Sequence, residues 1–199
     1  MNLITTTNSK LGGNIAQVNM PYCKSCRRDA PCFKECYCNK GNLRFPNVRK
    51  SHIEKYELYK NNPKGFFNQI DAELSMCPFK YFRWHASGDI VDEEYLSLMC
   101  KLARKHKETH FLCYTKKYEL VNTYLDSHKK PNNLVIVLSN WGKWKVDNPH
   151  NLPMSFVDFG KGDEGIPEFA YPCSGHCDKC DGVKCWHLHK GESVVFKKH

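Results

Sequence analysis

Apolar residues recur along the chain in two alternating patterns. Short segments that are apolar at every second position, or apolar throughout, predict β-strands, and each is bounded by turn-forming residues. The segment LVIVLS is apolar on both faces, which is typical of a parallel strand covered on each side. The predicted strands span residues 14–20, 80–86, 109–115, 134–139, 155–159 and 192–198.

Between these strands, apolar residues are spaced three or four positions apart, which predicts amphipathic helices. The clearest begins at Asp92, a good N-cap, followed by acidic residues in the first turn and basic residues near His106. Pro63 ends the first helix, and no helix is evident around Trp141 and Trp144. The predicted helices span residues 47–60, 66–77, 92–106 and 118–129.

Strands that alternate with helices predict a parallel α/β sheet. At 199 residues, the chain has the length of one domain, so residues 1–199 are expected to form a single β/α domain. The sheet is expected to be open or partly closed into a barrel. Cysteine-rich, metal-binding loops are expected at both ends of the chain, on a partial-barrel-like sheet.

The chain has twelve cysteines, and nine of them lie in these loops. Five lie in residues 23–38, named here the first cysteine loop, and four lie in residues 173–186, named the C-terminal cysteine knot. Metal ligation is favoured over disulfides because the cysteines are clustered at short spacings and no signal peptide is evident at the start. A disulfide-stapled secreted domain is the alternative.

The knot has the spacing C-x3-C-x2-C-x4-C, which suits tetrahedral zinc or a [4Fe–4S] cluster. Its compactness favours iron–sulfur over a zinc ribbon, with Zn as the alternative. Whether Cys23 is also a ligand, and whether the two groups share one cluster, stays open. The predicted ligands are Cys26, Cys32, Cys36, Cys38, Cys173, Cys177, Cys180 and Cys185.

Polar residues follow the predicted strands at their C-terminal ends, the edge where parallel α/β folds bind ligands. Because the first cysteine loop follows the first strand, it opens onto the same edge. His85 is also compatible with a buried core histidine. The predicted catalytic residues are His85, Asp89 and Lys116, and the predicted cofactor-binding residues are Ser87, Gly88, Asp89, Ser139 and Asn140.

A net charge of +9 is compatible with a nucleic-acid partner or with a solvated basic surface. No apolar window is long enough to span a membrane, so no membrane partner is expected and a cytoplasmic location is predicted. The substrate, whether a small molecule or a macromolecule, is not identified by the sequence.

The segments CRRDAPCFKECY, FRWHASGDIVDEEYL, FLCYTKK and CSGHCDKCDGVKCW resemble those of the phage gene product 88-like family. The resemblance covers about Leu11 to Trp186 and implies a protein of bacteriophages or their bacterial hosts. It maps the family's cysteines onto the four knot cysteines and onto Cys26, Cys32 and Cys36, with Cys23 and Cys38 as additions.

A looser resemblance is to radical S-adenosylmethionine (SAM) enzymes, which hold a [4Fe–4S] cluster on three cysteines after the first strand. Ser87, Gly88 and Asp89 stand where these enzymes have the turn that receives the methionyl amine. The first cysteine loop offers C-x5-C-x3-C or C-x3-C-x-C in place of the usual C-x3-C-x2-C.

The leading hypothesis is therefore an iron–sulfur protein of radical-SAM-like architecture. It would cleave SAM at an open-site cluster and carry an auxiliary cluster in the C-terminal knot. The alternative is a non-enzymatic zinc or iron–sulfur protein that binds nucleic acid or a host protein.

Overall fold

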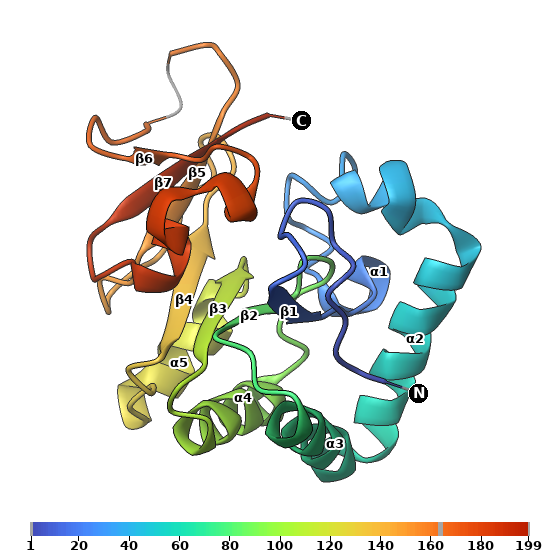
Figure 1. Cartoon of the computed structure of the whole chain (residues 1–199). Coiled ribbons are helices and arrows are strands. Elements are labelled where there is room, and N and C mark those ends of the chain that lie inside the picture. The colour runs from blue at the N-terminus through green and yellow to red at the C-terminus, as the bar shows by residue number, and fades with distance from the viewer. Residues whose placement is uncertain (1, 163–164, 199) are drawn as a thin grey trace.

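A computed structural model describes residues 2–162 and 165–198. Seven strands form one parallel sheet in the order β1-β2-β3-β4-β5-β7-β6 (Figure 1). No pairing joins β1 to β6, so the sheet is open and the predicted closure into a barrel is not complete. The strands are β1 (Ile15–Val18), β2 (Tyr81–Trp84), β3 (His110–Thr115), β4 (Leu134–Ser139), β5 (Met154–Asp158), β6 (Tyr171–Pro172) and β7 (Ser193–Lys197).

Helices make the crossovers between the first four strands, as the alternating pattern predicts. Asn62 caps α3 by accepting a hydrogen bond from the Gly65 N–H at 2.8 Å, and Pro63 takes its first position. This explains why α3 begins before the predicted residue 66. The helices are α1 (Tyr22–Ser25), α2 (Pro46–Asn61), α3 (Pro63–Met76), α4 (Glu93–Lys105) and α5 (Tyr118–Ser127).

Short 3-10 turns lie within the two cysteine-rich segments. They are η1 (Tyr37–Asn39) and η2 (Gly41–Arg44) after the first loop, and η3 (Cys177–Lys179) and η4 (Asp181–His187) in the knot. These turns and the two-residue β6 are absent from the sequence prediction. None of the described helices is long and apolar enough to cross a membrane.

The two faces of the sheet carry separate cores. Phe82 and Trp84 of β2 pack with residues of α2 to α5 in the larger core. The opposite face, named here the inner face, carries Leu112 and Val135, which pack with Trp186 of η4. The indole N–H of Trp186 donates to the Phe82 carbonyl at 3.0 Å. The knot therefore covers the inner face, where Figure 1 shows it in front of β3 and β4.

Candidate site at the C-terminal edge of the sheet

The first cysteine loop lies over the C-terminal edge of the sheet, where it contacts the end of β2. The Tyr37 hydroxyl donates to the Ala86 carbonyl, and Cys38 Sγ lies within hydrogen-bond distance of Ser87 Oγ, at 3.3 Å. Parallel strands bring their C-terminal ends to one edge, so the predicted meeting of the loop with the residues after β2 is confirmed.

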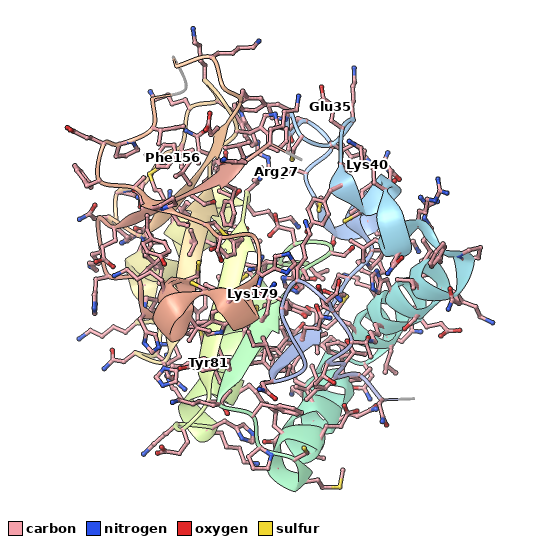
Figure 2. All side chains as sticks on the ribbon, turned by 45° about the horizontal axis from the view of Figure 1, so that its top comes forward. Arg27, Glu35, Lys40, Tyr81, Phe156 and Lys179 are labelled. Atoms are coloured by element: carbon pink, nitrogen blue, oxygen red, sulfur yellow. The ribbon has the colours of Figure 1, made fainter. Side chains whose placement is uncertain are left out.

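Ion pairs at the surface connect the loop to elements distant in sequence. Arg27 pairs with Asp29 within the loop and with Glu119 of α5, both at 2.7 Å. Glu35 pairs with Lys198, just after β7, at 3.0 Å. The loop therefore spans the edge from β1 to β7, and Figure 2 shows Arg27, Glu35 and Lys40 near the upper end of the molecule.

The thiols of the loop are close enough to influence one another. Burial raises the pKa of Cys26, and the negative charges of Asp89, Cys36 and Cys32 raise it further. A hydrogen bond from Cys38 lowers the pKa of Cys36 to about 7, while Cys38 keeps its proton and has a raised pKa. Cys36 is therefore the loop cysteine best prepared to act as a thiolate ligand.

Ser87, Gly88 and Asp89 form a tightly packed turn beneath this loop. The Ser87 N–H donates to Asn19 Oδ1 at 3.0 Å, and its hydroxyl donates to the Met20 carbonyl at 3.1 Å. Gly88 has φ +88°, and a Cβ there would lie 2.6 Å from the Met20 carbonyl oxygen and 2.7 Å from Ser25 Oγ. Only glycine fits this position without displacement of its neighbours.

Replacing Gly88 by alanine is therefore expected to destabilise the fold. Both the left-handed φ and the contact with the Met20 backbone cost free energy, together about 3 kcal/mol. Gly160 has φ +73°, but a Cβ added there would meet nothing within 4 Å, so G160A carries the conformational cost alone. Urea unfolding should show G88A to be less stable than G160A by about 2 kcal/mol. Equal losses would show that the turn accommodates a Cβ.

Asp89 is buried and held by main-chain groups. Its Oδ2 accepts the Lys116 N–H at 3.0 Å and its Oδ1 accepts the Ile90 N–H at 2.8 Å. Burial raises the pKa of this carboxyl group, against the hydrogen bonds that favour its ionised form. Asp89 thus joins the ends of β2 and β3 through these two hydrogen bonds.

Lys116 extends from the end of β3 towards β4. Its Nζ donates to Ser139 Oγ at 2.7 Å and lies 5.9 Å from the centre of the Trp141 ring. Burial raises the pKa values of Cys26 and Cys32, and the positive charge of Lys116 offsets part of that rise. The same charge contributes to the lowered pKa of Cys36. The structure thus brings Lys116 and Ser139 together beside the loop thiols.

Asn140, the next predicted cofactor-binding residue, lies at the β4–β5 connection. Its Oδ1 accepts the Trp141 N–H at 2.6 Å. With Trp144 and Met154, Asn140 lines an open hollow of about 480 Å³. The hollow therefore begins one residue after Ser139, the hydrogen-bond partner of Lys116, and Lys116 itself does not line it.

His85 does not join this group. Its backbone has φ +56°, and its Nε2 lies 3.1 Å from the Tyr95 hydroxyl of α4, within the core. The ring is buried, and burial together with the charges of Arg83 and Lys117 lowers its pKa to about 3. The structure places it as a neutral core histidine, so a catalytic role at the edge has no geometric support.

The C-terminal knot forms a second cysteine group on the inner face. Cys173, Cys177, Cys180 and Cys185 all line one small cavity beneath Trp186. The Tyr114 hydroxyl is buried beside the Cys185 thiol. Burial raises the pKa of Tyr114, the negative charge of Cys185 raises it further, and the hydroxyl in turn lowers the pKa of Cys185 through a side-chain hydrogen bond. A hydroxyl donor at this position suits a thiolate sulfur at Cys185.

All twelve cysteines lie in the described part of the chain, and none forms a disulfide there. Among the described residues, no three His, Cys, Asp or Glu side chains are grouped so as to hold a metal ion as they stand. A bound metal or cluster would have to draw the thiols closer together. Metal binding by either cysteine group stays a prediction.

A sequence model described as gene product 88 matches residues 2–164. The chain belongs to the gene product 88 family. The match includes the first cysteine loop, the Ser87–Gly88–Asp89 turn and β1 to β5, but it ends before the knot. The expected extent to Trp186 was therefore too long, and the family match does not include the four knot cysteines. No curated protein and no solved structure matches the chain.

Membership of the gene product 88 family, a bacteriophage-type family, agrees with the first resemblance and leaves the radical SAM resemblance without support from the comparisons. The predicted nucleic-acid partner and cytoplasmic location stay predictions. Sequence reasoning missed Arg27, Glu35 and Lys198 as residues that connect the loop to other elements, because their partners lie far along the chain.

Proposed function

We propose that this protein is an iron–sulfur protein that binds SAM at the C-terminal edge of its sheet. The contact between Cys38 and Ser87 carries the proposal, because it joins the cysteine loop to the turn that follows β2. The open parallel sheet, with consecutive strands β1 to β5 side by side, supplies an edge at which a loop and several strand ends converge.

The chemistry of the loop suits a [4Fe–4S] cluster. Cys26, Cys32 and Cys36 interact electrostatically, and Lys116 supplies a positive charge that favours their thiolate forms. Cys36, with a pKa of about 7, would be the first to bind. Three cysteine ligands would leave one iron open to a small molecule.

When bound, such a cluster supplies the electron that cleaves the sulfonium C–S bond of SAM. The chain's own residues would bind and orient that molecule. Gly88 lets the turn approach Met20 closely, and Asp89 fixes the turn to β3 through the Lys116 N–H. Lys116, whose Nζ donates to Ser139 Oγ, would supply a positive charge beside that molecule, and Asn140, the residue after Ser139, lines the β4–β5 hollow.

The C-terminal knot would hold an auxiliary cluster or zinc. Its four cysteines surround one cavity, and Tyr114 offers a hydroxyl that can donate to the Cys185 sulfur once it is a thiolate. Four cysteine ligands would leave no open position, so this group would have a structural or electron-transfer role.

Anaerobic reconstitution with iron and sulfide, followed by metal counting and EPR of the reduced protein, tests the proposal. We expect a cluster signal that changes when SAM is added, since SAM would bind at the open iron. Absence of iron uptake, or a signal indifferent to SAM, would contradict it. A colourless protein that contains zinc and binds nucleic acid in a salt-dependent manner would instead support the non-enzymatic alternative.

A further inference from the structure

Arg83 is a positive charge on the inner face of the sheet. In β2 the side chains of Phe82 and Trp84 enter the larger core, so Arg83 between them points to the opposite face. There its guanidinium carbon lies 4.2 Å from the centre of the Tyr114 ring of β3. The side chain is half-buried.

Its partners in the protein use little of its hydrogen-bonding capacity. Nε donates to the Trp84 carbonyl at 3.2 Å, and within residues 2–162 and 165–198 no carboxylate pairs with the guanidinium. Arg27 provides the contrast, since it pairs with the carboxylates of Asp29 and Glu119. The two terminal amino groups of Arg83 therefore have N–H donors to offer to a ligand.

The geometry limits which ligand these donors can bind. The Tyr114 ring covers one face of the guanidinium group, and the Trp84 carbonyl occupies Nε, so a partner would approach the terminal nitrogens in the guanidinium plane. Two parallel N–H donors in one plane match the two oxygens of a carboxylate or phosphate group. A half-buried charge that no carboxylate of the described residues neutralises also favours an anion energetically.

Arg83 also stands between the two cysteine groups. The Tyr114 ring that it contacts packs in the same cluster as Cys177 and Cys185 of the knot. Tyr37 of the first cysteine loop donates to the Ala86 carbonyl, three residues after Arg83. A ligand held by Arg83 would therefore lie near both groups.

We propose that Arg83 binds an oxyanion, the carboxylate or phosphate group of a ligand, on the inner face of the sheet between the first cysteine loop and the C-terminal knot. The proposal does not depend on a bound cluster. It can therefore fail while the proposed iron–sulfur function holds, and the reverse is also true.

NMR of the metal-free, full-length protein with labelled arginine side chains tests this binding. Sodium acetate and inorganic phosphate are titrated separately, with chloride keeping the ionic strength constant. We expect the Arg83 signal, identified by its loss in R83K, to shift saturably, while the Arg27 signal stays in place because its donors are occupied. A saturable shift of the Arg83 signal with acetate alone would identify a carboxylate ligand, and one with phosphate alone would identify a phosphate ligand.

The same protein gives the result that would overturn the proposal. If Arg83 serves only to neutralise the knot thiolates, its signal will respond to a rise in pH but will show no saturable response to either anion. The Arg83 guanidinium lies against the Tyr114 ring, and this contact gives a second way to assign the Arg83 signal. The unaltered protein therefore decides the question even if R83K and R83Q fold poorly. In folded R83Q, binding of the favoured anion should fall at least tenfold.

Discussion

Replacing Cys36 by alanine is expected to remove the iron held by the first cysteine loop, a loss of about four iron atoms per chain for one [4Fe–4S] cluster. The pKa of Cys36 is lowered to about 7 by hydrogen bonds from Cys38, and the charge of Cys36 raises the pKa of Cys26. Losing one of three thiolate ligands would leave too few to retain the cluster. Iron counting and visible absorption of anaerobically reconstituted protein measure the effect.

Cys77 provides the matched control, because it is exposed at the C-terminal end of α3 and lies outside both cysteine groups. C77A should bind as much iron as the unaltered protein, whereas C26A and C32A should behave like C36A. C38A separates two roles of that residue: retained iron would identify it as the partner of Ser87 and Cys36, and lost iron as a ligand. Equal iron in C36A and C77A would contradict a cluster in this loop.

The regular elements of the fold could be predicted because their signals are local. The apolar run of β4, Leu134–Ser139, and the capped helix that begins after Asp92 match the predicted spans within a residue. β6 and the 3-10 turns of the knot could not be predicted in this way. They depend on pairing with β7 and on contacts of Trp186 with the sheet, which no local pattern records.

The candidate site was predictable only to the level of topology. Parallel strands place Ser87 and Lys116 at one edge, and the chain order places the first cysteine loop there as well. The direction of each side chain was beyond that reasoning. At His85 the backbone leaves the extended conformation, so the ring contacts Tyr95 in the core and does not continue the alternation of β2.

The same limit explains why Arg83 and Tyr114 were not among the predicted site residues. Period-two alternation places both on the inner face, but it does not show that they stack or that the described residues provide no carboxylate for Arg83. Those facts depend on which side chains of the distant knot reach this face. Charge balance in a folded interior can be judged only after the chain has brought its segments together.

Lowering the pH from 7.5 to 5 is expected to reduce the free energy of unfolding by about 4 kcal/mol through two buried histidines. Burial lowers the pKa of His85 to about 3 and that of His52 to about 4. An unfolded chain protonates both near pH 6.5. As the pH falls below that value, the unfolded state takes up protons that the folded state does not, so stability decreases. Each histidine contributes about 2 kcal/mol of this loss.

Urea unfolding of the metal-free, reduced protein at the two pH values measures this loss, and glutamine variants assign it. Glutamine does not titrate, so H52Q should lose about 2 kcal/mol less than the unaltered protein over the same pH interval, and H85Q likewise. The comparison uses the change with pH, so any loss of stability that the substitution itself causes at pH 7.5 cancels. A pH dependence in H85Q equal to that of the unaltered protein would show that His85 is protonated in the folded state, in conflict with its buried position against Tyr95.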